Sequence, residues 1–253
     1  MTAVATQGAE AVQLVGVTKV FGRGDQSVVA LEQVSLTVAP GEFICLIGAS
    51  GCGKSTLLNL VAGLEQPSTG TVSVAASQVA MMFQEPALFP WLTAAGNVEL
   101  ALRARKVPKA ERRQRVVELL DLVRLAGFGD RRPHELSGGM RQRVALARAL
   151  AQDADVLLMD EPFGALDAIT RDTLHDELDR IREGRPFTTL FVTHNVREAV
   201  RLGDRVVLLS SHPGRVAGEF EVPISHPRRI DSTSVAELAA TITDKLKEAM
   251  AGS

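Results

Sequence analysis

A glycine-rich run that ends in lysine, serine and threonine is the part of this 253-residue chain most clearly suited to chemistry. It consists of Gly48, Ala49, Ser50, Gly51, Cys52, Gly53, Lys54, Ser55 and Thr56. Glycines let backbone N–H groups turn inward around anionic oxygens, and a following helix adds the positive end of its dipole. Lys54 offers a mobile positive charge for phosphates, and the Ser55 hydroxyl is a ligand for Mg²⁺. The whole run is therefore predicted to be a phosphate-binding loop.

A hydrophobic strand that ends in two acidic residues supplies a second element. Val156 to Met159 is apolar, and Asp160 and Glu161 follow it directly. Ligands of open α/β sheets bind at the carboxyl ends of the strands. We therefore expect Asp160 to hold Mg²⁺ or its water, and Glu161 to polarise an attacking water as a general base. Taken alone, the pair has an alternative reading as a charged turn that caps a core strand.

The elements around these segments predict an α/β fold. The run 43–47 is continuously apolar, as expected for a strand buried on both faces, and it leads into the glycine-rich loop. Helices are predicted at 56–62, at 111–125 and from Ser137 onward, where apolar residues recur at helical spacing. The other strands are predicted at 12–17, 28–38, 156–160, 189–193 and 206–209.

These elements divide the chain into four predicted segments. Residues 1–84 are expected to form an antiparallel β subdomain and the first part of a P-loop NTPase core, and 85–151 an inserted α-helical subdomain. Residues 152–222 form the second part of the core, and 223–253 a C-terminal extension with an amphipathic helix. The predicted fold class is therefore α/β, with both subdomains attached to a P-loop core.

Charge and cysteine content argue against several classes of protein. Lys and Arg total 28 against 30 Asp and Glu, so the basic surplus of a typical nucleic-acid binder is missing, and no nucleic-acid partner is expected. Cys45 and Cys52 are the only cysteines, too few for a disulfide scaffold. The first twelve residues do not read as a secretory signal, and no apolar run approaches the ~20 residues that span a bilayer. If a membrane matters to this protein, other chains must cross it.

The segment Leu136 to Arg143, with the sequence LSGGMRQR, is more specific. It resembles the signature motif of ABC ATPases and precedes the Asp160 strand, as in that family. Ser137, Gly138 and Gly139 at a helix start would form an anion site through the helix dipole and backbone amides. The resemblance implies that this motif closes over ATP held by another subunit. An N-capped helix after a loop would explain Ser137 but not the two glycines.

Further residues resemble family motifs in the family's order. Gln84 resembles the glutamine that senses the metal and the attacking water. His194 resembles the switch histidine that contacts the γ-phosphate, and Ala165-Leu166-Asp167 resembles the loop that crosses between subunits. Phe21 lies where the family commonly places an aromatic ring against adenine. Each of these also has a purely structural alternative. Gln84 could simply be a polar residue at a strand end, and His194 could be a structural histidine. The segment 165–167 could be a helix cap, and Phe21 could pack in the core.

The resemblance implies a subunit that binds and hydrolyses ATP with Mg²⁺ to energise import of a small solute. Lys54, Glu161, His194 and Gln84 would carry catalysis, and closure of a dimer would complete each site. The implied partners are a second ATPase subunit, with a homodimer favoured, integral membrane permease subunits and, indirectly, a solute-binding protein. The implied location is the cytoplasmic face of the membrane, as a peripheral subunit. The alternatives are a soluble ABC-type ATPase, such as one for cluster assembly, and a catalytically silent binding module.

Three segments narrow the resemblance further. Residues 89–93, 194–199 and 212–215 resemble those of importers for nitrate, sulfonates and taurine. Asn195 is a departure, because Asp is more usual after the switch histidine. The apolar cluster 87–92 is a candidate docking surface for a permease helix. The alternative is that its aromatic side chains only pack the helical lobe.

Overall fold

The computed structural model describes residues 10–164, 166–184 and 187–251. The chain separates into two compact units: 1–77 together with 187–253 form the first unit, and 78–186 form the second. The division into four segments stays a prediction. The α/β fold class is confirmed by the mixture of sheets and helices and by the solved structures reported below.

An antiparallel sheet begins the first unit. Its strands are β1 (Val12–Phe21), β2 (Val28–Val38) and β4 (Thr69–Val74), in the order β2-β1-β4, and the short 3-10 helix η1 (Gly24–Gln26) joins the first two. β1 pairs antiparallel with both neighbours. This confirms the strands predicted near the N-terminus.

A second sheet of the first unit carries the glycine-rich loop. β3 (Phe43–Gly48) lies between β7 (Thr188–Val192) and β8 (Arg205–Leu209) and is parallel to both, whereas β9 (Val216–Glu221) is antiparallel to β8. Every residue of β3 is buried, which explains why its sequence does not alternate. Burial of each large apolar side chain contributes about 1.5–3 kcal/mol. This central strand therefore anchors the loop that follows it.

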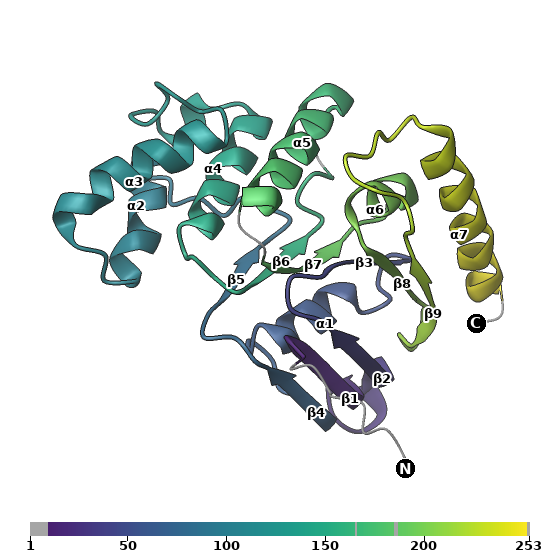
Figure 1. The fold of residues 1–253 in the computed structure, drawn as a ribbon. Coiled ribbons are helices and arrows are strands. Elements are labelled where there is room, and N and C mark those ends of the chain that lie inside the picture. Colours follow the sequence, from purple (N-terminus) through teal and green to yellow (C-terminus); the bar gives the residue numbers. More distant parts are fainter. Residues whose placement is uncertain (1–9, 165, 185–186, 252–253) are drawn as a thin grey trace, which may run out of the picture. The chain divides into compact units, whose positions relative to one another are not determined.

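Helices cover both faces of the β3 sheet. α1 (Lys54–Val61) contacts β3 and β7 and also reaches β2 and β4 of the antiparallel sheet. α6 (Val196–Leu202) packs on β3 and β8, and α7 (Thr233–Ala251) packs on α6 and β9, as Figure 1 shows.

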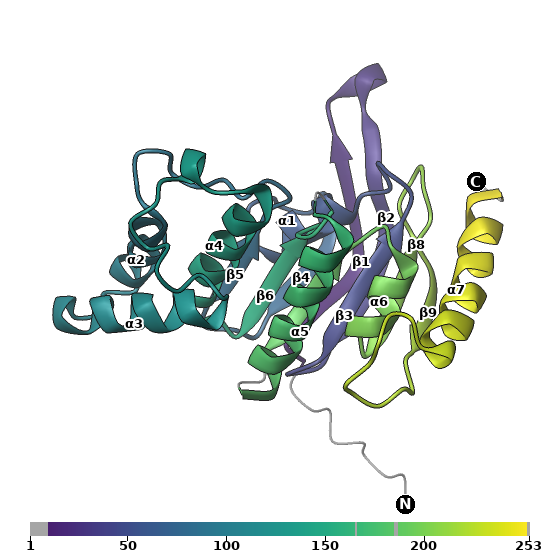
Figure 2. The same ribbon diagram turned by 90° about the horizontal axis from the view of Figure 1, so that it is seen from above.

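The second unit combines two parallel strands with a group of helices. β5 (Val79–Met82) pairs in parallel with β6 (Val156–Asp160). The helices are α2 (Ala94–Ala104), α3 (Lys109–Leu122), α4 (Gly138–Leu150) and α5 (Ala168–Gly184), with the 3-10 turn η2 (Pro133–Glu135) before α4. α2 contacts both α3 and α4, and the three helices group together in Figure 2.

The cysteines and the helices bear on two of the general expectations from the sequence. Cys45 and Cys52 are buried free thiols. Among the described helices, none combines the length and the apolar character needed to cross a bilayer.

Candidate functional site

The glycine-rich loop turns sharply between β3 and α1. Gly51 and Gly53 have φ values of 78° and 94°, which lie in the left-handed region that favours glycine. A Cβ on Gly53 would lie 2.6 Å from Leu31 Cδ2 and 2.8 Å from the carbonyl oxygen of Ala30. Conformation and space therefore both require glycine at the residue that precedes α1.

The Lys54 side chain folds back over this loop. It is only 7% exposed, and its Nζ donates to the carbonyl oxygens of Gly48 at 2.9 Å and Ala49 at 2.8 Å. The first-turn N–H groups of α1 lack intrahelical acceptors, as in any helix. Ser55 is exposed and Thr56 partly exposed in the same turn. The loop thus places a positive charge, backbone donors and hydroxyls close together, which is the chemistry of a phosphate site.

His194 lies beyond the neighbouring strand. Because β3 and β7 are parallel, the phosphate loop and His194 both follow the carboxyl ends of adjacent strands. The His194 side chain is exposed. Asn195 caps α6, since its Oδ1 accepts from the N–H groups of Arg197 at 3.0 Å and Glu198 at 3.3 Å. Asparagine and aspartate cap helices about equally well, so this departure keeps the cap.

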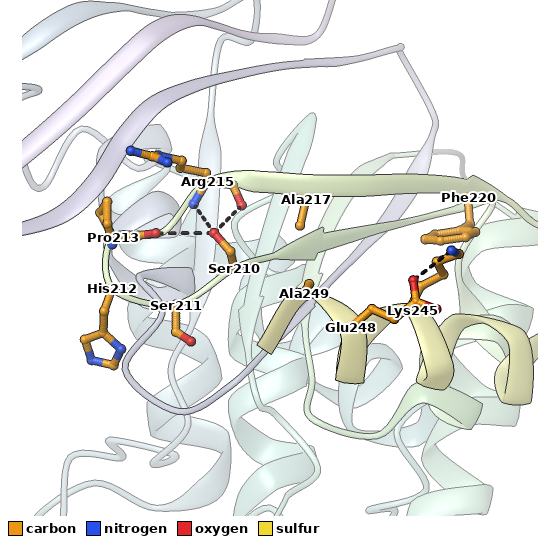
Figure 3. A pocket seen from close by; sticks show the side chains of 10 residues that line it. All are labelled: Ser210, Ser211, His212, Pro213, Arg215, Ala217, Phe220, Lys245, Glu248 and Ala249. Carbon is orange, nitrogen blue, oxygen red and sulfur yellow. Dashed lines mark hydrogen bonds and ion pairs between the residues drawn. The ribbon is translucent and has the colours of Figure 1, made fainter. Parts of the chain in front are cut away.

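A third segment at this edge supports the phosphate loop. Gly214, in the turn between β8 and β9, donates its N–H to the Ala30 carbonyl at 3.1 Å, and a Cβ on Gly214 would lie 2.2 Å from the Cys52 carbonyl oxygen. This turn and the end of α7 line a pocket, whose side chains Figure 3 shows. Its volume is about 530 Å³. His212 and Lys245 are among the lining residues. The pocket therefore lies on a turn that packs directly against the backbone of the phosphate loop.

Phe21 lies at the end of β1 with 40% of its surface exposed. The Nζ atom of Lys19 lies 4.8 Å from the centroid of its ring, within the range of a cation–π contact. The ring is therefore not buried in the core, and its exposed surface is available for stacking.

The second unit brings the other predicted catalytic residues to one strand edge. β5 and β6 run in parallel with Met82 opposite Met159, so Gln84 and the pair Asp160 and Glu161 lie at the ends of adjacent strands. The Gln84 side chain is exposed, and both acidic side chains are partly exposed. Glu161 has a φ of 43°, which is uncommon for a residue other than glycine.

The signature segment forms the start of α4, as predicted. The Ser137 Oγ accepts from the N–H of Met140 at 3.2 Å and so caps the helix. Ser137 and Gly138 are exposed. A Cβ on Gly139 would lie 2.7 Å from Thr170 Cγ2 of α5, which gives this glycine a packing role that the sequence did not reveal.

The segment predicted to cross between subunits is described only in part, because Ala165 lies outside the described residues. Asp167 accepts from the N–H of Thr170 at 3.0 Å and from its Oγ1 at 2.7 Å. These hydrogen bonds, the backbone one first, lower the pKa of Asp167 from its usual value. Asp167 therefore caps the start of α5, and the role of 165–167 between subunits stays a prediction.

Comparisons with known proteins agree with these features. The family model described as "ABC transporter" matches residues 31–164. The aliphatic sulfonates import ATP-binding protein SsuB 1 of Mesorhizobium japonicum is 45% identical over 249 residues, which cover 96% of this chain and 91% of that protein. The taurine import ATP-binding protein TauB of the same organism is 50% identical over 199 residues, 76% of this chain and 77% of that protein.

A solved structure shows the same fold. It is the dimeric post-hydrolysis state of the ATP-binding cassette MJ0796 bound to ADP and Pi, with a TM-score of 0.77 and 34% identity. The similarity covers 85% of this chain and all of that chain. This chain therefore belongs to the ABC transporter family, as an ATP-binding and ATP-hydrolysing subunit of an importer.

Proposed function

We propose that this chain powers the import of sulfonates, a class that includes taurine, by hydrolysing ATP as a dimer on the cytoplasmic face of the membrane. The observation that carries the ATPase part is the donor-rich loop around the Lys54 ammonium and the start of α1. The names of the two relatives from Mesorhizobium japonicum support the sulfonate part. A permease and a solute-binding protein would complete the transporter.

Phosphoryl transfer to water depends mostly on positioning and charge stabilisation, and the predicted residues divide these tasks. Lys54 and the loop amides bind the phosphates, and the Phe21 ring stacks on adenine. Ser55 and Asp160 would hold Mg²⁺, and Gln84 would be a further contact. Their hydroxyl and carboxylate oxygens suit this hard cation, which proteins usually bind through one or two such groups together with substrate phosphates. When bound, the metal would supply positive charge at the phosphates.

Two further residues act on the reacting groups. Glu161 accepts a proton from the attacking water as it approaches the γ-phosphate. His194 contacts the γ-phosphate. Both side chains have exposed surface available for these contacts.

The presence of a second anion site on the same chain supports a dimer. The exposed tip of α4, with Ser137 and Gly138, would bind the triphosphate held by the phosphate loop of a partner copy. ATP would then stabilise the closed dimer, because only this state provides both sets of contacts. The dimeric MJ0796 cassette is a precedent for such an arrangement.

The sulfonate proposal is tested with the chain assembled with its permease in lipid vesicles. Addition of the solute-binding protein loaded with taurine or another alkanesulfonate is expected to raise the rate of ATP hydrolysis, because loaded binding protein favours the state in which the ATPase sites close. Binding protein loaded with nitrate serves as the comparison. If only the nitrate-loaded binding protein stimulates ATP hydrolysis, the transported solute is nitrate and the sulfonate proposal fails. ATPase activity that never co-purifies with a permease would contradict the transport role.

The segment 87–92 fits a docking surface better than a packed cluster. Trp91 is 68% exposed, and its ring centroid lies 5.4 Å from that of Phe89. The buried Asn97 fixes Phe89, accepting from its N–H at 2.8 Å and donating to its carbonyl at 3.2 Å. The backbone is therefore held from within the unit while the indole stays in solvent. We further propose that Trp91 contacts the permease.

Replacement of Trp91 by alanine is expected to weaken assembly with the permease by roughly 30-fold, since a buried Trp at an interface commonly contributes about 2 kcal/mol or more. The melting temperature of the isolated chain should stay unchanged, because the side chain is mostly exposed. Phe128→Ala, which removes another exposed aromatic side chain from the same unit, is the control. Intact folding together with intact assembly of the Trp91 variant would exclude the docking role.

A further inference from the structure

A buried glutamine of α4 joins the two turns that carry Gln84 and Glu161. The side chain of Gln142 is 3% exposed. Its Nε2 donates to the backbone oxygen of Gln84 at 3.0 Å and to that of Pro162 at 2.5 Å. One amide group of the signature helix therefore holds the turn after β5 and the turn after β6.

The chemistry of the partners determines the orientation of this amide. Both are backbone carbonyls, which only accept hydrogen bonds, so the NH₂ group of Gln142 must face them. The Oε1 atom is buried and, among the described residues, has no hydrogen-bond partner. Burial of an unpaired polar atom is unfavourable, and an apolar side chain of similar size would avoid it. Core packing alone therefore does not explain a glutamine at this position, whereas the need for a two-fold donor does.

Arg148, further along α4, reinforces the contact with the Gln84 turn. Its Nη2 donates to the carbonyl oxygen of Pro86 at 2.8 Å, and its Nη1 donates to that of Ala87 at 2.7 Å. The signature helix thus holds the backbone from Gln84 to Ala87 through side-chain donors.

The Pro162 contact acts on a strained backbone. Glu161 adopts a φ of 43°, and such conformations persist only where the surroundings enforce them. The N–H of Gly164 donates to the Glu161 carbonyl at 3.2 Å, and Gln142 holds the next carbonyl, that of Pro162. The direction of the Glu161 carboxylate depends on this backbone, and hence on Gln142.

We propose that Gln142 is a positioning residue for ATP hydrolysis. Its amide keeps the Glu161 turn in the strained conformation that aims the carboxylate, and it links that turn to the Gln84 turn so that both follow the signature helix. The inference rests on the proposed roles of Glu161 and Gln84. Gln142 itself is expected to contact neither the nucleotide nor the attacking water.

The first test is Gln142→Leu in the purified full-length chain. The variant has an apolar side chain of similar size, which cannot donate a hydrogen bond. We expect kcat for ATP hydrolysis to fall by about 10- to 100-fold, since small misplacements of a catalytic group have effects of this size. ATP affinity should change by less than about twofold, because no residue of the phosphate loop is altered. Gln114→Leu is the matched control, since the Gln114 amide donates to Glu118 on the exposed face of α3.

Unchanged turnover in Gln142→Leu would overturn the proposal. So would a parallel loss of ATP binding and thermal stability, which would indicate a general folding role. Glu161→Gln is measured beside it: if that variant keeps wild-type turnover, the proposed function fails. If Glu161→Gln is inactive while Gln142→Leu is normal, only the positioning role fails.

Gln142→Glu provides a readout that a packing role would not change. When ionised, the introduced carboxylate places an acceptor against two carbonyl oxygens. When protonated, it can donate a hydrogen bond to one of them. Burial raises the pKa of a carboxyl group, so the introduced glutamate is protonated at a higher pH than an exposed one. We expect the ratio of the kcat of Gln142→Glu to that of the wild type to rise several-fold as the pH is lowered from about 8 to about 6. A ratio that stays constant with pH would contradict the hydrogen-bond mechanism.

Discussion

Substitution of Glu161 by glutamine is expected to lower kcat for ATP hydrolysis by about 100-fold or more, the range for loss of a general base. The amide keeps the size of the side chain but cannot accept the proton of the attacking water. ATP binding should persist, because the phosphate loop is unchanged. Bound ATP would then remain intact, and the dimer that it stabilises should accumulate. Steady-state kinetics and size-exclusion chromatography with ATP and Mg²⁺ measure both effects.

The control for this variant is Glu118→Gln, which removes a carboxylate from the exposed face of α3, where its partner is Gln114. It should hydrolyse ATP like the wild type. Wild-type turnover in the Glu161 variant would refute the general-base role. A monomeric Glu161→Gln chain in saturating ATP, even in the presence of the permease, would instead contradict closure of the dimer around the nucleotide.

Lys54→Ala is expected to weaken ATP binding by about 10- to 100-fold. Hydrogen bonds to charged groups contribute about 1.5–3 kcal/mol, and each 1.4 kcal/mol corresponds to a tenfold change in Kd. The ammonium lies over the phosphate loop on the carbonyls of Gly48 and Ala49, so a bound phosphate would meet a charge that is already in position. Isothermal titration calorimetry with ATP measures the loss.

Lys247→Ala removes the same type of side chain from α7, where the ammonium is exposed and pairs with Asp244 at 3.2 Å. It should bind ATP normally. The melting temperature of Lys54→Ala is recorded as well, because two backbone carbonyls lose a donor. Unchanged affinity in a folded Lys54→Ala chain would show that the loop does not bind phosphates through this lysine.

The elements near the phosphate loop could be predicted because their signals are local. The apolar run 43–47 became β3, and Val156–Asp160 became β6 with the predicted bounds. Helix bounds from the apolar pattern were less accurate. The apolar pattern gave 56–62, whereas α1 begins at Lys54, as expected for a helix that directly follows the loop, because the left-handed Gly53 ends the loop there. The predicted helix 111–125 is Lys109–Leu122 and begins directly after Pro108.

The roles of several site residues depend on contacts that the sequence does not show. Asp167 caps α5, a role that the sequence allowed, whereas the role of 165–167 between subunits stays a prediction. Gly139 accommodates a threonine of α5, so its small size serves packing within its own unit as well as the signature motif. Trp91 is exposed rather than packed, and this depends on how the segment is held by Asn97. In each case the outcome depends on a neighbour whose position a sequence pattern does not specify.

The amino-acid sequence by itself determined the chemistry of this protein: a phosphate loop between strand and helix, an acidic strand end, and a signature segment at a helix start. These features consist of adjacent residues whose order is sufficient to define them. Only the tertiary structure showed that Gln142 joins Gln84 and Pro162, which lie 58 and 20 positions away along the chain. Periodicity predicts which face of a helix is buried, but the carbonyls that a buried amide meets are decided by how distant segments pack together.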